Sequence, residues 1–110
     1  MTSNDAWRRA IEDKYIKDFQ RLPVTRARRD FLFAKWAGQE LGRNDIDAYV
    51  EEVRLSSATS TGDAALLHKV LEDLRAAGLN VKEEGLRSIL HEMMFEAAAE
   101  LEAANPIGIA

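Results

Sequence analysis

Residues 27–42 constrain the fold of this chain more than any other stretch. Apolar side chains recur there at helical spacing, and a helix with so broad an apolar face has to be covered by other elements. We predict a core helix that starts after Pro23, whose ring does not suit a helix interior, and stops at Gly42, which favours a left-handed cap. The predicted buried stripe comprises Ala27, Phe31, Leu32, Ala34, Trp36, Ala37, Gly38 and Leu41.

Three further segments predict helices. One begins at the N-cap Asn44, one runs from the N-cap Asp63 to Gly78, and one begins near Lys82. The Ser/Thr-rich run 56–62 predicts a flexible loop, because its side chains compete for backbone hydrogen bonds. The chain is therefore expected to be a single all-α domain over residues 1–110, with a four-helix bundle at 23–104 and a loose tail at 105–110.

The segment before Pro23 predicts a separate kind of helix. Its large apolar residues Trp7, Ile11, Tyr15 and Phe19 are spaced by four, so they form a slanted ridge on an otherwise charged helix. This ridge could pack on the bundle or enter a groove on a partner, and the two readings are compatible. Because proline disfavours helical geometry before it, we predict that Pro23 separates this helix from the core helix or sharply kinks it.

The chain has one strongly positive patch. Arg21, Arg26, Arg28 and Arg29 stand in a stretch without an acidic residue between positions 21 and 29. Such arginines can form a solvated face, pair with carboxylates of the acidic last helix, or hold a phosphate or a partner's carboxylate. The pattern leaves these alternatives open.

Composition argues against several classes of function. The chain has no cysteine, which excludes disulfides, thiol catalysis and cysteine zinc sites. The net charge of −4 argues against nucleic acid as a partner, and no apolar run has the length of a signal peptide or a membrane span. Phe95 follows His91 by four residues, so the histidine pair of a metalloprotease is missing. We predict no catalytic residue, no metal site and no enzyme activity.

Several motifs at constant spacing resemble those of one known family. They are Ala27-Arg28-Arg29 with Leu32, Trp36-Ala37 and Leu41-Gly42; Ala10-Ile11-Glu12-Asp13-Lys14-Tyr15; Ala48-Tyr49 with Glu52-Val53; and Lys69-Val70 with Asp73-Leu74 and Ala77-Gly78. From about Trp7 to about Ala99, the chain resembles the zeta subunit, the inhibitor of the F-type ATP synthase in alphaproteobacteria. It departs from the family pattern at Pro23 and in the loop 56–61, which is acidic in the family.

The resemblance implies a regulator that binds the catalytic head of the ATP synthase, formed by its alpha, beta and gamma subunits. It implies that residues 1–22 dock at an alpha/beta interface and block hydrolysis, and that the protein is a cytoplasmic monomer when free, peripheral to the membrane. It also implies ATP or ADP as a regulatory ligand, for which we consider Arg26, Arg28 and Arg29. The expected partner-binding residues are Trp7, Arg8, Arg9, Ile11, Glu12, Lys14, Tyr15 and Phe19. A non-inhibitory partner of the synthase and a nucleotide-binding sensor are the alternatives.

Overall fold

The chain folds into four helices. The computed structural model describes residues 2–104, apart from the side chains of residues 2–4 and 18. The helices are α1 (Thr2–Glu40), α2 (Ile46–Ser57), α3 (Ala64–Ala76) and α4 (Glu83–Ala104), and the described part contains no strand. The predicted all-α fold is therefore confirmed, whereas the predicted tail at 105–110 lies outside the described residues.

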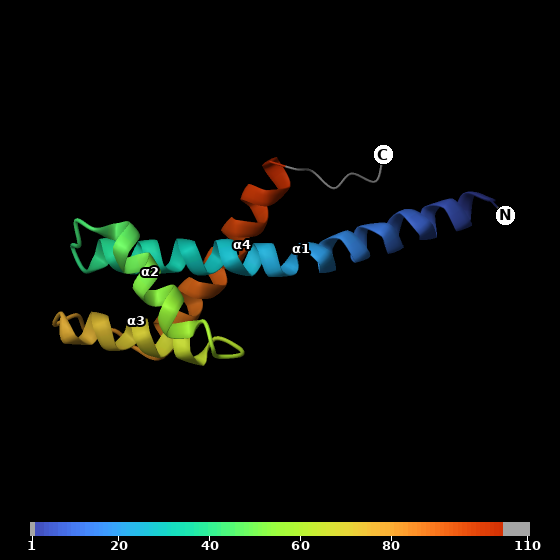
Figure 1. The fold of residues 1–110 in the computed structure, drawn as a ribbon. Helices are drawn as coiled ribbons and strands as arrows, with labels where there is room; N and C mark the ends of the chain where they lie inside the picture. The colour runs from blue at the N-terminus through green and yellow to red at the C-terminus, as the bar shows by residue number, and fades with distance from the viewer. Residues whose placement is uncertain (1, 105–110) are drawn as a thin grey trace.

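Of the two alternatives predicted at Pro23, separation of the helices is wrong, because α1 is one helix that continues across this residue. Pro23 cannot donate to the carbonyl of Phe19, but this carbonyl belongs to an exposed stretch where water can solvate it. Just beyond the proline, the Thr25 hydroxyl donates to the Arg21 carbonyl at 3.0 Å. Figure 1 shows that α1 changes direction here without a break.

The helices form a body from which the first half of α1 projects. α4 crosses the middle of α1, while α2 and α3 pack beside its second half (Figure 1). The described molecule is elongated, with extents of 63 × 24 × 23 Å. We call residues 2–22 the arm and residues 23–104 the body.

The core of the body combines residues from all four helices. On α2, α3 and α4 the buried positions recur at helical spacing. On α1, however, the fully buried Phe33 is missing from the predicted stripe, whereas the predicted Ala27 is exposed. Residues 31–34 are all apolar, so periodicity alone cannot decide which of them faces the other helices. The main buried residues are Phe33, Ala34, Ala37, Tyr49, Val53, Leu66, Leu67, Val70, Leu74, Leu86 and Leu90.

Two predicted helix ends are confirmed. Gly42 and Gly78 adopt positive φ angles of 71° and 83° directly after α1 and α3, where a residue with a Cβ would be strained.

Other boundaries differ from the prediction. The N-cap of α2 is Asp45 rather than Asn44, because the Tyr49 amide donates to the Asp45 carbonyl at 3.0 Å. Ser56 and Ser57 belong to α2, where their hydroxyls donate to carbonyls one turn earlier. The loop therefore begins only at Ala58.

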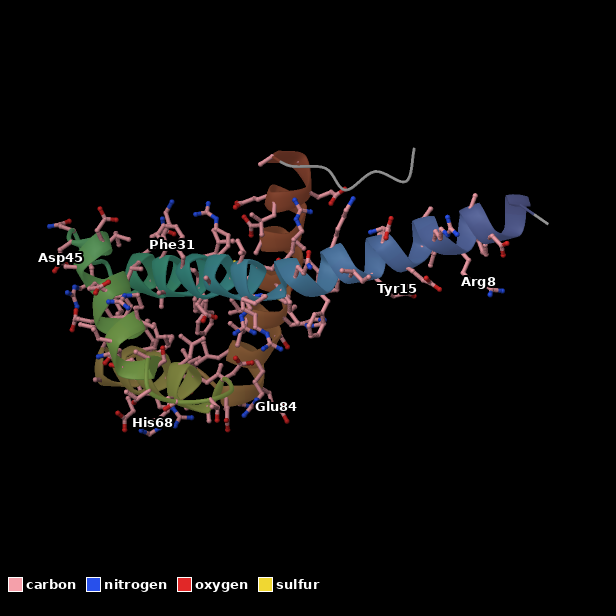
Figure 2. All side chains as sticks on the ribbon, turned by 45° about the vertical axis from the view of Figure 1, so that its right-hand side comes forward. Arg8, Tyr15, Phe31, Asp45, His68 and Glu84 are labelled. Carbon is pink, nitrogen blue, oxygen red and sulfur yellow. The ribbon has the colours of Figure 1, made fainter. Side chains whose placement is uncertain are left out.

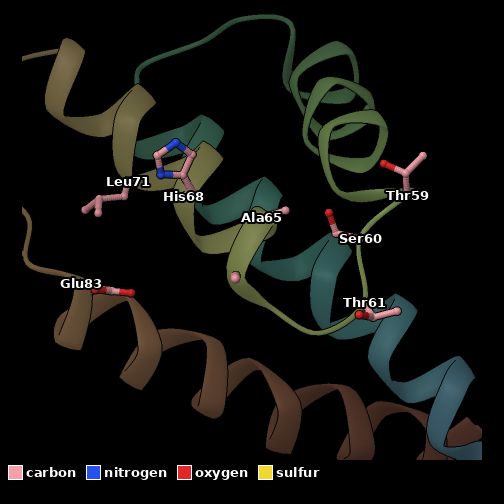
Figure 3. Close-up of a pocket in the computed structure, with 8 residues that line it drawn as sticks. Thr59, Ser60, Thr61, Ala65, His68, Leu71 and Glu83 are labelled. Atoms are coloured by element: carbon pink, nitrogen blue, oxygen red, sulfur yellow. The ribbon is translucent and has the colours of Figure 1, made fainter.

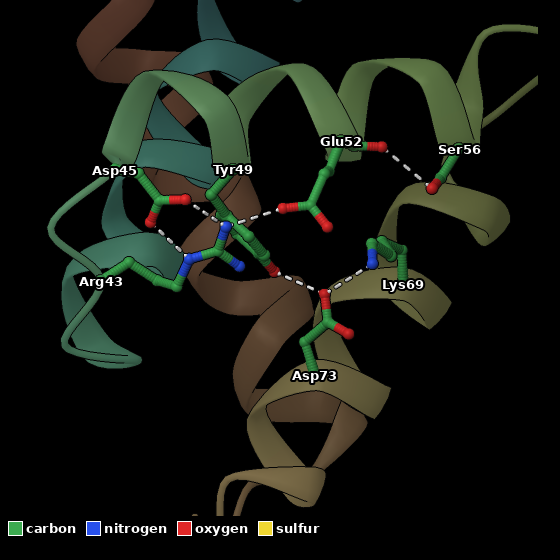
Figure 4. Close-up of polar contacts among 7 residues, drawn as sticks. All are labelled: Arg43, Asp45, Tyr49, Glu52, Ser56, Lys69 and Asp73. Atoms are coloured by element: carbon green, nitrogen blue, oxygen red, sulfur yellow. Dashed lines mark hydrogen bonds and ion pairs between the residues drawn. The ribbon is translucent and has the colours of Figure 1, made fainter.

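A polar network fastens α2 to α3 and to the preceding turn (Figure 4). The Tyr49 hydroxyl donates to Asp73 at 2.9 Å, and Lys69 pairs with the same carboxylate at 3.0 Å. Arg43 binds Asp45 through two hydrogen bonds of 2.7 Å and also reaches Glu52. Burial and the bond to Asp73 raise the pKa of Tyr49, so this phenol stays protonated and keeps donating.

Candidate functional site

The arm presents an uncovered aromatic ridge. Trp7, Tyr15 and Phe19 are exposed by 67%, 72% and 76%, respectively, and Ile11 is half-buried. At about 1.5 Å per residue, the arm is a helix about 30 Å long. Figure 2 shows it as a single helix with side chains standing out around it. Large apolar side chains gathered on an uncovered helix mark an interaction surface.

The ridge lies on the side of α1 that faces the core farther along the helix. Tyr15 and Phe33 are 18 residues apart on one continuous helix, which is about five full turns. Trp7 and Thr25 have the same spacing, and Thr25 is buried. The ridge therefore continues the buried face of α1 into a region where the body no longer covers it.

The end of α4 holds the root of the arm. Arg21 donates to the carboxylate of Glu102 at 2.9 Å and to the carbonyl of Leu101 at 2.8 Å. Beside these bonds lies a hollow of about 590 Å³, lined from α1 by Lys14, Arg21, Leu22 and Thr25. From α4 it is lined by Met94, Ala98, Ala99, Leu101 and Glu102. The arm thus meets the body at a groove between α1 and α4.

The charged residues expected in the contact accompany the ridge. Arg8, Arg9 and Glu12 are exposed, and Lys14 is half-buried near the end of α4. The structure therefore brings all eight predicted partner-binding residues together on one helix.

The arginine patch is held mainly by carboxylates. Arg28 bonds to Glu100 of α4 at 2.6 Å, as the pairing alternative predicted. Arg29 is buried and donates to both oxygens of Asp63, which occupies the N-cap of α3 without a capping hydrogen bond, and to Asp30. Burial alone would lower the pKa of Arg29, but the bonds to Asp63 and Asp30 raise it. For the carboxyl group of Asp30, burial acts in the opposite direction and raises the pKa.

Two hollows bear on the predicted nucleotide site. A hollow of about 180 Å³ includes Arg29, Asp63, Arg87 and His91, but ligand pockets usually hold about 300–1,000 Å³. A broader hollow of about 770 Å³ lies beside the loop after α2 (Figure 3). Its lining holds hydroxyls, His68 and Glu83 but neither lysine nor arginine. Arg26 is exposed elsewhere, and a nucleotide site at Arg26, Arg28 and Arg29 stays a prediction.

Among the side chains that the structure describes, no three His, Cys, Asp or Glu residues are placed to hold a metal ion. No helix in this part of the chain is long and apolar enough to cross a membrane.

Sequence reasoning missed one feature near the root of the arm. Phe95 of α4 is 66% exposed and makes an edge contact with the His91 ring, with centroids 4.9 Å apart. It lies off the stripe of buried residues Leu86, Leu90 and Ala97, and a large apolar residue off that stripe is the signal that could have identified it.

An elongated helical protein with an exposed aromatic arm has the architecture of a binding or regulatory protein. The family model of ATPase inhibitor subunit zeta matches residues 1–100, and the chain belongs to this family. The family implies a regulator that associates with an ATP synthase. Searches among curated proteins and among solved structures gave no match.

Proposed function

We propose that this protein inhibits ATP hydrolysis by the F-type ATP synthase by inserting its arm at a catalytic alpha/beta interface. The observation that carries the proposal is the exposed ridge, whose aromatic side chains project from a helix that the body does not cover. Exposure of these apolar side chains to water is unfavourable, and binding in a partner's groove would bury them.

The inhibition follows from the cycle of the enzyme. The alpha/beta interface has to open and close during each turnover. A helix that binds one of these states better than the others shifts the population towards it. With the arm in place, the interface stays in one state and rotation in the hydrolysis direction stops. The body then remains outside the interface, at the cytoplasmic face of the enzyme.

A non-inhibitory partner of the synthase is the alternative. This alternative would be favoured if Pro23 separated the arm from the core helix, because the arm would then be only loosely connected to the body. Because α1 continues across Pro23, a force on the arm is transmitted to the body, and this favours the inhibitory reading. The loop also departs from the family pattern, but it is not part of the arm. It follows the C-terminal end of α2, whereas α1 leads into the N-terminal end of α2.

The test measures ATP hydrolysis by the purified catalytic head of the synthase. We expect the full chain to lower turnover and a chain without residues 1–20 to leave it unchanged. Tyr15→Ala should weaken inhibition by about tenfold, as truncation of an aromatic anchor does. Val24→Ala is the matched control, because Val24 is exposed on the same helix and lies nine residues, or about two and a half turns, from Tyr15.

Two results would contradict the proposal. Equal inhibition by the shortened chain would show that the arm is not the inhibitory element. Tight binding of the full chain without any loss of turnover would favour the non-inhibitory partner.

A further inference from the structure

The ridge on the arm is one wall of a corner, and α4 supplies the other. The groove at the root of the arm joins Leu22 of α1 to Ala98 and Ala99 of α4. Phe95 precedes these two alanines by three and four residues, so the three side chains share one face of α4. The exposed Phe95 ring therefore stands one turn from the groove into which the ridge leads.

The three aromatic side chains of the ridge supply only part of the area of a stable complex. A fully covered aromatic side chain buries about 150–250 Å². At their observed exposure, Trp7, Tyr15 and Phe19 would contribute on the order of 400 Å². Stable interfaces bury about 800 Å² per partner. Phe95 and the groove add apolar surface next to the ridge, and this brings the total closer to that size.

We infer that the ridge and the α4 face carrying Phe95 form one docking surface. Its occupant is an amphipathic helix of the ATP synthase, and this inference rests on the proposed function. Side chains spaced by four form the ridges that fit the grooves of another helix. The arm satisfies its backbone hydrogen bonds within the helix, so it offers no edge to which a strand could add.

The charges of the arm favour a protein over a membrane. Helices that lie on anionic lipid have a polar face rich in lysine and arginine. Here Arg8, Arg9, Lys14 and Lys17 are balanced by Asp5, Glu12, Asp13 and Asp18. The fifth basic residue of the arm, Arg21, is paired with Glu102 of α4. The arm therefore has no net charge that would attract it to an anionic lipid surface. It is instead complementary to a partner helix that has an apolar stripe flanked by residues of both charges.

The experiment compares Phe95→Ala with Leu55→Ala in the full chain. Leu55 is 60% exposed on α2 and does not line the groove, so it controls for the loss of an exposed apolar side chain. We expect Phe95→Ala to raise the Kd for the catalytic head by about tenfold, and Leu55→Ala to change it by less than about twofold. Thermal unfolding of each variant checks that the fold is retained.

A second measurement places a photoreactive phenylalanine analogue at position 95. We expect it to crosslink to a helical segment of the synthase head in the complex. Absence of any crosslink to the synthase, or an unchanged Kd for Phe95→Ala while Tyr15→Ala still weakens inhibition, would overturn the two-walled surface and leave the proposed function standing.

The membrane is tested with vesicles of phosphatidylcholine and phosphatidylglycerol. We expect the full chain not to sediment with them at physiological salt. Sedimentation that Phe95→Ala abolishes would assign this surface to lipid and overturn the inference. Failure of the proposed function looks different, because removal of residues 1–20 would then leave inhibition intact whatever stands at position 95.

Discussion

The two halves of α1 have similar residue types but opposite environments. Tyr15 in the arm and Phe33 in the body are about five turns apart on the same side of the helix. Tyr15 is 72% exposed and Phe33 is completely buried. The difference arises from what lies opposite each residue, since α2, α3 and α4 cover the second half of α1 and leave most of the first half open. Burial of an aromatic residue therefore does not follow from its place in a helical pattern.

The sharpest test of this comparison is a pair of truncations. Phe33→Ala should lower the free energy of unfolding by about 3–5 kcal/mol, because it leaves a cavity in the core. Tyr15→Ala should change it by less than about 0.5 kcal/mol. Urea denaturation of both variants measures the difference. Should the first variant not fold, Phe33→Leu provides a milder change of the same sign. Equal losses at the two positions would mean that the arm is covered in solution.

A smaller effect is expected where the two halves meet. Arg21→Ala removes the bonds to Glu102 and Leu101 and should lower the free energy of unfolding by about 1 kcal/mol, since Glu102 is half exposed and solvent weakens the pair. Amide exchange in the last turns of α4 should become faster. Arg26→Ala, at an exposed position of the same helix, is the control. Unchanged exchange at the end of α4 would show that these bonds do not hold the arm.

Two glycines extend the contrast between covered and open helix faces. A Cβ at Gly38 would lie 3.1 Å from Ile46 and 3.2 Å from Tyr49, whereas a Cβ at Gly85 would meet nothing within 4 Å. Gly85→Ala should stabilise the protein by about 0.5–1 kcal/mol through helix propensity. Gly38→Ala should destabilise it by about 0.5–1 kcal/mol, because overpacking outweighs the same gain. Thermal unfolding decides both signs, and stabilisation by Gly38→Ala would indicate a looser contact between α1 and α2.

The weakest expected effect concerns pH and the surface of the body. The hydrogen bond from Arg43 holds the pKa of Asp45 at about 2, below its ordinary value of 3.8. Because the folded pKa is depressed, the Asp45 pair stabilises the fold above pH 3.8, and this contribution is lost as pH falls towards 2. An NMR titration of the Asp45 carboxyl should show this value, and Arg43→Ala should return the pKa towards 3.8. An unchanged pKa in that variant would assign the shift to another group.

Much of this structure could be predicted from local patterns. Apolar periodicity predicted α2, α3 and α4, and Gly42 and Gly78 marked helix ends because only glycine adopts positive φ without strain. The ridge was identified from its four-residue spacing. At Pro23, only the alternative that this residue separates two helices was wrong, since the penalty of a helical proline can be offset where water solvates the freed carbonyl and Arg21 anchors the helix to α4.

The sequence by itself determined where helices form and which side chains share a helical face, because both depend on neighbours within a few residues. Only the tertiary structure decided that Phe33 lies in the core, that Arg29 binds Asp63, and that Tyr15 and Phe95 remain exposed. These features depend on which helices cross and where each ends. Contacts between distant parts of the chain are set by packing of whole helices, and no local pattern records them.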